Sequence, residues 1–217
     1  MLSLSEENYL KSIYHLSNHG EEEVSTNAIA DSLKTKPASV SDMLKKLAVK
    51  QLIDYERYQG VKLSMIGKSR ALQIIRKHRL WEVFLVQKLG FHWDEVHEVA
   101  EQLEHINSEL LTQKLDDFLG HPSHDPHGDP IPDALGKMKI TGQRLLNSFS
   151  KANPCTVVGV KDSSVAFLQY LDKLGIGLGT KVYIHDVIAF DGSMEIEIEG
   201  KIKVNISKEA SKNIYAN

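Results

Sequence analysis

The residues best suited to chemistry lie between Asp94 and Ile106, in the segment D-E-V-H-E-V-A-E-Q-L-E-H-I. At about 100° per residue of an α-helix, two histidines and two glutamates fall on one stripe that covers roughly a third of the circumference. These four residues are His97, Glu101, Glu104 and His105. Imidazole nitrogens and carboxylate oxygens suit a divalent first-row metal ion. The segment therefore indicates a metal site, with a solvated face rich in Glu and His as the alternative.

The helix that carries these residues is expected to be amphipathic and to continue to about Phe118. Its apolar residues mark a different face, turned toward a core: Val96, Val99, Ala100, Leu103 and Leu110. A preceding long helix is predicted over residues 65–88, and it carries His78 and Glu82, an i,i+4 pair that can share one ion. Two long helices rich in Leu and Val indicate either a dimer interface or a core within one chain.

The bulk composition is that of a globular protein with a real core, since 41% of the 217 residues are hydrophobic and 25% are charged. No apolar run approaches the roughly 20 residues that a bilayer span needs, and the first residues lack the basic and apolar regions of a signal peptide. The single cysteine, Cys155, excludes an intrachain disulfide and a multi-cysteine zinc site. The expected location is therefore cytoplasmic.

Positive charge is concentrated in one segment of the chain. Between Lys34 and Arg79, twelve Lys or Arg residues stand against three acids, a local net charge of +9, and the overall charge of −3 leaves −12 for the rest. A basic segment on an otherwise acidic protein indicates contact with a polyanion on one face. A lysine-rich solvated surface is the alternative.

This basic segment falls within a predicted winged helix-turn-helix. Helical periodicity covers residues 4–18, a second helix opens at Ser25 or Thr26, and a third runs from Pro37 to Lys50. A short β-hairpin around Gly60 follows. In such a domain the third helix enters the major groove of DNA and the hairpin lies along the backbone. The residues expected to contact double-stranded DNA are Lys36, Pro37, Ser39, Ser41, Asp42, Lys45, Lys46, Arg57, Tyr58 and Lys62.

The remainder of the chain divides into a loop and a β-rich region. Residues 120–133 are rich in Pro and Gly, and Asp125 and His127 within them are further candidate ligands, with an ordinary surface loop as the alternative. A helix is expected over residues 141–150. From Cys155 onward, short strands separated by glycine turns indicate a small, strongly bent barrel.

With these parts in this order, the chain resembles the diphtheria toxin repressor family, metal-activated bacterial transcription factors that include the manganese transport regulators. The resemblance covers nearly all 217 residues. Four motifs carry it: E-N-Y-L-K-S-I-Y at Glu7–Tyr14, R-K-H-R-L-W-E at Arg76–Glu82, V-H-E-V-A-E-Q-L-E-H at Val96–His105 and D-P-H-G-D-P-I-P at Asp125–Pro132.

The resemblance implies an α+β fold that is mainly α. The expected domains are a winged helix-turn-helix at residues 1–65, a helical metal-binding and dimerisation domain at 66–145, a linker at 146–154, and a small SH3-like, FeoA-like β-barrel at 155–217. The implied primary metal site comprises Asn8, Glu101, Glu104 and His105. The implied second site comprises His78, Glu82 and His97, joined by Asp125, His127 and Asp162.

Departures from the family pattern bear on the metal. The carboxylate of Glu101 replaces a sulfur ligand of the iron-type members, which favours Mn(II), with Fe(II) next and Zn(II) or other divalent ions as substitutes in vitro. Asn8 stands where manganese-type members often have Asp, so the site has one negative charge fewer. Lys11 stands where a small manganese subgroup has a Glu ligand, and it cannot ligate while charged.

The implied function is that of a homodimeric, manganese-responsive repressor that binds a palindromic operator, controls metal-ion transport genes and has no membrane or small-molecule partner. An Fe(II)-responsive repressor and a regulator that has lost its metal dependence are alternatives. A di-metal hydrolase is a further alternative, because paired Glu and His can activate a bound water. No nucleophile or phosphate-binding motif stands out to support an enzyme.

Overall fold

The computed structural model describes residues 2–55, 60–138, 142–151 and 154–217. The chain forms two compact units. The first comprises Met1–His78, Glu101–Glu109 and Pro132–Lys137, and the second comprises Arg79–Ala100, Leu110–Ile131 and Met138–Asn217. Two helices, α4 (Met65–Leu89) and α5 (Val96–Leu103), contribute residues to both units. No helix in these described ranges is both long and apolar enough to cross a membrane.

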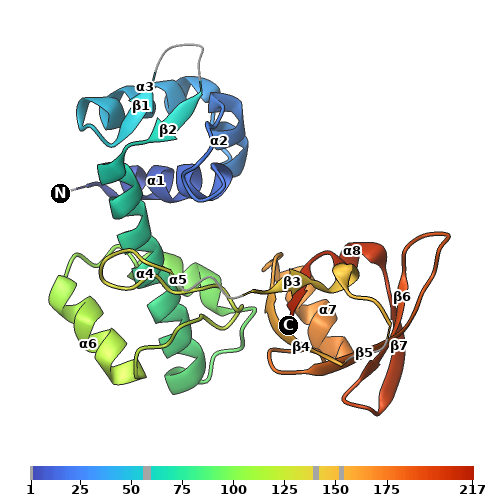
Figure 1. Ribbon diagram of the computed structural model, residues 1–217. Helices are drawn as coiled ribbons and strands as arrows, with labels where there is room; N and C mark the ends of the chain where they lie inside the picture. Colours follow the sequence, from blue (N-terminus) through green and yellow to red (C-terminus); the bar gives the residue numbers. More distant parts are fainter. Residues whose placement is uncertain (1, 56–59, 139–141, 152–153) are drawn as a thin grey trace. The chain divides into compact units, whose positions relative to one another are not determined.

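Three helices and a hairpin open the first unit (Figure 1). They are α1 (Leu4–Leu16), α2 (Thr26–Ser32), α3 (Pro37–Val49), β1 (Ile53–Tyr55) and β2 (Val61–Leu63). The Ser3 hydroxyl accepts from the Glu6 N–H at the start of α1, and the Ser3 N–H donates to the Glu6 carboxylate. Ser25 caps α2, and Pro37 occupies the first turn of α3. The strands pair antiparallel. This order is that of a winged helix-turn-helix, as the sequence predicts.

The core of this domain comes from the apolar stripe of each helix. Leu10 and Ile13 of α1, Ile29 of α2, and Leu44 and Leu47 of α3 are all inaccessible to solvent. Burying side chains of this size supplies about 1.5–3 kcal/mol each. Polar residues of α3 are thereby left on its opposite face.

The helices after α4 differ from the prediction. The sequence predicts one helix to Phe118, but α5 ends at Leu103 and a separate α6 runs over Glu109–Leu119. Between them, the Ile106 N–H donates to the Leu103 carbonyl and the Ser108 N–H to the Ile106 carbonyl, which interrupts the i→i−4 ladder. Glu104 and His105 therefore lie on a turn after α5 and not on the helix itself.

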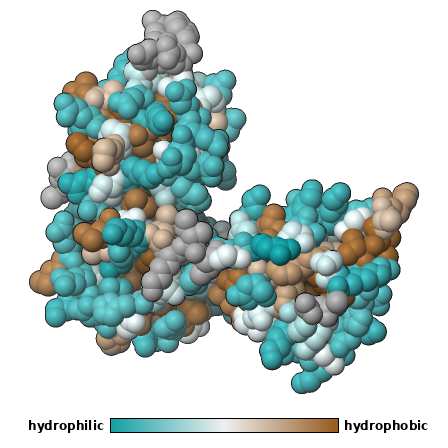
Figure 2. All heavy atoms as spheres, viewed as in Figure 1, coloured by the Kyte–Doolittle hydropathy of each residue, from teal (hydrophilic) through white to brown (hydrophobic). Residues whose placement is uncertain are grey.

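Part of the apolar surface of the second unit is exposed. Leu110 was expected to face a core, but 66% of its surface is exposed, and Leu89 and Phe118 are exposed to 57% and 63%. In Figure 2, hydrophobic side chains interrupt the mostly hydrophilic surface in this helical region. These three side chains are therefore open to solvent in a single chain.

The second unit also contains a six-stranded antiparallel sheet in the order β3-β8-β4-β5-β6-β7. Its elements are β3 (Arg144–Leu145), β4 (Cys155–Val160), α7 (Val165–Leu174), β5 (Lys181–Val187), β6 (Met194–Ile198), β7 (Ile202–Ile206), α8 (Lys208–Ser211) and β8 (Ile214–Ala216). In β6, buried Met194, Ile196 and Ile198 alternate with half-buried Glu195 and Glu197. This is the period-two pattern predicted for a strand with one face on a core.

The predicted helix over residues 141–150 is wrong. Residues 144–145 form strand β3, which pairs with β8, and residues 146–148 form a short 3-10 turn, with Leu146 fully buried in the barrel core. The predicted linker at 146–154 therefore begins inside the barrel. A two-residue strand leaves no periodic pattern, which is why the sequence suggested a helix here. Residues 139–141 and 152–153 lie outside the described residues.

We expect Gly67→Ala to destabilise the first unit. A Cβ at residue 67 would lie 1.8 Å from the Leu52 carbonyl oxygen, and a backbone atom cannot move aside as a flexible side chain can. Overpacking of this kind costs about 2–3 kcal/mol, more than the roughly 1 kcal/mol that alanine gains over glycine in a helix. Urea unfolding measures the change. Gly177→Ala is the control, since a Cβ there meets nothing within 4 Å. Equal stability of the two variants would contradict the prediction.

Candidate functional site

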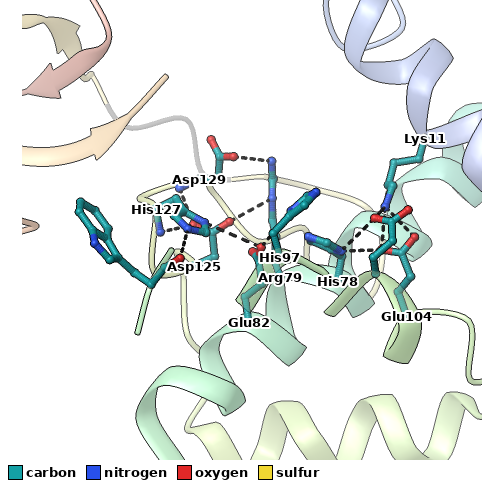
Figure 3. A network of polar contacts seen from close by, with 11 residues as sticks. Lys11, His78, Arg79, Glu82, His97, Glu104, Asp125, His127 and Asp129 are labelled. Atoms are coloured by element: carbon teal, nitrogen blue, oxygen red, sulfur yellow. Dashed lines mark hydrogen bonds and ion pairs between the residues drawn. The ribbon is translucent and has the colours of Figure 1, made fainter. Parts of the chain in front are cut away.

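A first cluster of charged side chains lies where α1 meets the turn after α5. The Lys11 Nζ donates to Glu101 Oε2 at 2.5 Å and to both carboxylate oxygens of Glu104, at 2.7 and 2.8 Å. From α4, His78 Nδ1 lies 2.5 Å from Glu104 Oε2 (Figure 3). Ligand atoms of His78, Glu101 and Glu104 all lie within 4.8 Å of one another. Two carboxylates and one imidazole thus converge on one small volume.

The Glu104 carboxylate has no exposure to solvent. Burial acts to raise its pKa, but the hydrogen bond with His78 and the positive charge of Lys11 outweigh burial and lower the pKa below its usual value. Glu104 is therefore ionised at neutral pH. A buried carboxylate keeps its charge only where cations and hydrogen-bond donors compensate it.

The His105 ring is oriented by a carboxylate of α1. Its Nδ1 lies 2.6 Å from Glu7 Oε2, and both side chains are largely buried. A carboxylate accepts from Nδ1–H, so the lone pair of the neutral ring is on Nε2. That Nε2 is buried and has no hydrogen-bond partner in the described part of the chain. A carboxylate that fixes the far nitrogen is the usual support of a metal-binding histidine.

Asn8 offers a second unpaired acceptor. Its Oδ1 is buried and, within the described ranges, accepts no hydrogen bond. Asn8 follows Glu7 and precedes Lys11 by three residues, so all three share one face of α1. A buried acceptor without a partner costs about 1–3 kcal/mol. Of the predicted primary ligands, Glu101 and Glu104 are grouped, and His105 Nε2 lies 3.8 Å from Glu104 Oε1, but His105 is not in a close group with Glu101 among the described residues. The donor types, nitrogen and oxygen, fit a divalent cation.

A second cluster lies in the second unit. Ligand atoms of Glu82, Asp125 and His127 lie within 4.8 Å of one another, and all three residues are buried. His97 joins from α5, with its Nδ1 3.6 Å from Glu82 Oε1, although its side chain is 59% exposed. Ligand atoms of His78 also lie within 4.8 Å of those of Glu82, so five of the six residues predicted for the second site are grouped around Glu82.

The loop that carries Asp125 and His127 is rigidly held. Asp125 Oδ1 accepts from the backbone N–H groups of His127 and Asp129, both at 2.9 Å. From α4, Arg79 donates to the Pro130 carbonyl at 2.5 Å and to Asp129 Oδ2 at 3.1 Å, and its Nε lies 3.5 Å from Asp125 Oδ2 (Figure 3). The guanidinium fixes the loop and balances its negative charge.

The orientation of the His127 ring is set by Trp93. His127 Nε2 lies 2.8 Å from the Trp93 carbonyl oxygen, and the two rings stack with their centroids 6.2 Å apart. A carbonyl only accepts, so Nε2 carries a hydrogen. The other nitrogen, Nδ1, lies 3.8 Å from Glu82 Oε1. Nδ1 is therefore the atom that faces the cluster.

Protons are bound strongly in this second cluster. Burial and the charge of Glu82 raise the pKa of Asp125 to about 7. For His127, burial opposes protonation, but the hydrogen bond and charge of Glu82 outweigh it and raise the pKa to about 9. At neutral pH His127 is protonated and Asp125 is partly protonated. A cation that uses these atoms as ligands has to displace their protons.

Two predicted ligands of the second site also have other partners. His78 lies one turn before Glu82 on α4, and its ligand atoms lie within 4.8 Å of those of Glu82, but its Nδ1 is 2.5 Å from Glu104 Oε2. Asp162 Oδ1 accepts from the Ser164 N–H at 2.8 Å, and Asp162 is not in any group of close ligand atoms among the described residues. The barrel does reach the loop, because the Val160 N–H of β4 donates to the His127 carbonyl at 2.8 Å. The ligand roles of all these residues remain predictions.

Four residues that make contacts within the two clusters are not predicted by the sequence. They are Glu7, Lys11, Arg79 and Asp129, and from the sequence Lys11 is expected only to be unable to ligate. The i,i+4 spacing of Glu7 and Lys11 around Asn8 places them on one helical face, so the sequence could have identified both as neighbours of Asn8. The partners of Arg79 lie some fifty residues away in sequence, so no local pattern identifies them.

The residues predicted to contact DNA lie mostly at the surface. Lys36, Pro37, Ser39, Asp42, Lys45, Lys46 and Lys62 are exposed, and Ser41 is half-buried. Lys45 Nζ pairs with Asp42 Oδ1 at 2.9 Å, and the Ser41 hydroxyl donates to the Pro37 carbonyl at 3.1 Å. Arg57 and Tyr58 lie outside the described residues.

Comparison with protein families finds matches along most of the chain. Residues 1–61 match the DNA-binding domain of iron-dependent repressors, residues 65–133 match the metal-binding and dimerisation domain of the same proteins, and residues 144–217 match the FeoA domain. The α+β fold class with a DNA-binding head, a helical domain and a FeoA-like barrel is thereby confirmed.

Individual relatives agree with these matches. A solved structure of a manganese-dependent transcriptional repressor in complex with manganese is 34% identical, with a TM-score of 0.88 over 97% of this chain and 98% of that one. The iron-dependent repressor IdeR of Mycobacterium leprae is 33% identical over 129 residues, 59% of this chain, and the match spans about half (56%) of that relative. The diphtheria toxin repressor of Corynebacterium diphtheriae is 27% identical over 90% of this chain and 89% of its own.

These relatives are transcriptional repressors and not enzymes, so the hydrolase alternative is set aside. Divalent metals feature in the names and titles of several of them. With its three domain matches and a full-length structural relative, the chain belongs to the diphtheria toxin repressor family of metal-dependent transcriptional repressors.

Proposed function

We propose that this chain is a metal-activated repressor that responds to Mn(II) and controls genes for metal-ion transport, acting in the cytoplasm, where its operator DNA lies. The observation that carries the proposal is the pair of buried, unpartnered acceptors, Asn8 Oδ1 and His105 Nε2, among the described residues. They belong to the same unit as the converging carboxylates of Glu101 and Glu104. Such acceptors are costly unless a cation satisfies them.

The choice of metal follows from the donor atoms. The proposed primary site offers one imidazole nitrogen, one amide oxygen and two carboxylates, with no sulfur, which favours Mn(II) over more thiophilic ions. Fe(II) is the alternative, and Zn(II) is expected to substitute in vitro. The relatives include both manganese-dependent and iron-dependent repressors. Glu82, Asp125, His127 and His97 form the proposed second site, with His78 and Asp162 as further predicted ligands.

The residues of the primary site connect α1 with the turn after α5. Asn8, Glu101, Glu104 and His105 would hold a divalent ion, which would supply positive charge to the two carboxylates. Glu7 holds His105 in the tautomer that leaves Nε2 available. Because α1 packs in the DNA-binding domain, a firmer link at this point stabilises one position of α3. Couplings of this kind are typically worth 1–3 kcal/mol.

The proposed DNA contact uses two copies of the chain. Exposed Leu89, Leu110 and Phe118 supply an apolar face suited to a homodimer. Two α3 helices in such a dimer would read half-sites of a palindromic operator about 34–36 Å apart. The lysines of α3 and Lys62 of β2 would pair with phosphates, which gives affinity and salt dependence more than sequence choice.

Replacing Glu104 is expected to abolish metal-dependent DNA binding. In Glu104→Ala the proposed primary site loses its fully buried carboxylate, so Mn(II) should no longer raise operator affinity by the 5–150-fold typical of an allosteric effector. Fluorescence anisotropy on a palindromic duplex selected with the wild-type protein measures the effect. Glu109→Gln, an exposed acid at the start of α6, is the control. Normal Mn(II) activation of Glu104→Ala would refute the primary site.

Removing one lysine of α3 is expected to weaken DNA binding without changing sequence preference. In Lys46→Ala, the plot of log affinity against log salt concentration should become less steep by about one unit, because one phosphate contact is lost. Lys173→Ala, an exposed lysine of the barrel, should leave the slope unchanged. Should both variants keep the wild-type slope, Lys46 does not contact phosphate.

Metal binding at the second site is expected to release protons. Because the His127 pKa is about 9 and His127 ligates only when neutral, the apparent affinity should rise as pH increases toward 9 and level off above it. The rise should be about tenfold per pH unit for each proton released. Titration calorimetry with Mn(II) in buffers of different ionisation enthalpy counts the protons. His127→Ala should lose this release and one bound ion, whereas His185→Ala should not. Binding that is independent of pH would argue against His127 as a ligand.

A further inference from the structure

Lys11 occupies the position in which a cation would be expected. Its three donor hydrogens match three carboxylate oxygens: Oε2 of Glu101 and both oxygens of Glu104, all within 2.8 Å. The Lys11 side chain is only 13% exposed, and that of Glu104 is fully buried. A flexible surface lysine does not usually give up this much solvent, so the two carboxylates hold it in place.

The charges of the cluster show what the ammonium does there. Glu7, Glu101 and Glu104 contribute three negative charges, and Lys11 contributes one positive charge from within the same group of contacts. Without Lys11, Glu104 would retain His78 at 2.5 Å and His105, whose Nε2 lies 3.8 Å from Glu104 Oε1, and neither histidine is a permanent cation. Lys11 therefore stabilises the metal-free protein as an internal counter-ion.

The same contacts exclude a metal ion. Carboxylate oxygens coordinate divalent ions at about 2.0–2.2 Å, so a metal ion and an ammonium cannot both occupy the point where Glu101 and Glu104 converge. Two cations that shared these carboxylates would also repel each other strongly in a buried site. The four-carbon stem of lysine allows its ammonium to move out toward solvent.

We propose that Lys11 is a tethered competitor of the metal ion: its ammonium fills the primary site in the metal-free protein and must leave before Glu101 and Glu104 can coordinate a metal. This inference rests on the proposed function of that site. Its consequence is a higher metal concentration for activation than the same ligands would require without Lys11.

Paired lysine variants test the competition. Lys11→Met keeps the length of the side chain and removes its charge, so Mn(II) should bind at least about tenfold more tightly, while the metal-free protein should melt at a lower temperature. Lys50→Met is the matched control, because Lys50 also neutralises a buried glutamate of α1, Glu6, at 2.7 Å. It should lower the melting temperature without changing Mn(II) affinity. Unchanged or weaker Mn(II) binding by Lys11→Met would overturn the proposal.

A measurement on the wild-type protein tests whether the Lys11 ammonium leaves the site when Mn(II) binds, even if Lys11→Met does not fold. Acylation with an amine-reactive reagent, followed by peptide mass spectrometry, reports the accessibility of each lysine. Mn(II) should increase labelling of Lys11 and leave Lys50 unchanged, whereas equal or reduced labelling of Lys11 would overturn the proposal. A failure of the proposed metal site can be told apart from a failure of the Lys11 proposal. If the metal site itself is wrong, Glu104→Ala will bind Mn(II) as the wild type does.

Discussion

The constraint on which the first unit depends is a carboxylate without access to water. Glu104 is ionised and fully buried, so its charge must be compensated from within the protein. Lys11 from α1 and His78 from α4 provide that compensation. Since neither partner is close to Glu104 in sequence, the charge can only be satisfied when the DNA-binding domain, α4 and the turn after α5 come together. The Glu104 carboxylate would be destabilising if buried alone, so its need for partners favours the arrangement in which these three segments meet.

The two clusters solve the problem of buried charge in different ways. Around Glu104 the compensation comes from a permanent cation, so the carboxylate stays ionised and its pKa is lowered. Around Glu82 and Asp125 the compensation comes in part from protons, held by His127 and Asp125 with raised pKa values. Both arrangements keep negative groups together at neutral pH in the absence of a metal ion. Under the proposed metal binding, an ion would replace an ammonium in one case and protons in the other.

Local features of the sequence were sufficient for much of the fold. Serine caps, Pro37 at the start of α3 and the periodicity of Leu and Ile predicted the DNA-binding helices, because these signals act within a few residues. The strict alternation in β6 likewise predicted a half-buried strand. Prediction failed where local preference was weak: the break between α5 and α6, and the two-residue strand β3, which exists only because it pairs with β8.

For the candidate sites, the sequence by itself determined the inventory of nitrogen and oxygen donors and the family to which the chain belongs, because residue types and short spacings are local properties. It did not determine the partners of those donors. Tertiary structure decided that Glu7 orients His105, that Arg79 holds the loop of Asp125, and that Lys11 lies between Glu101 and Glu104. These contacts join residues about 46 to 98 positions apart, and only the folded chain brings their charges within reach of one another.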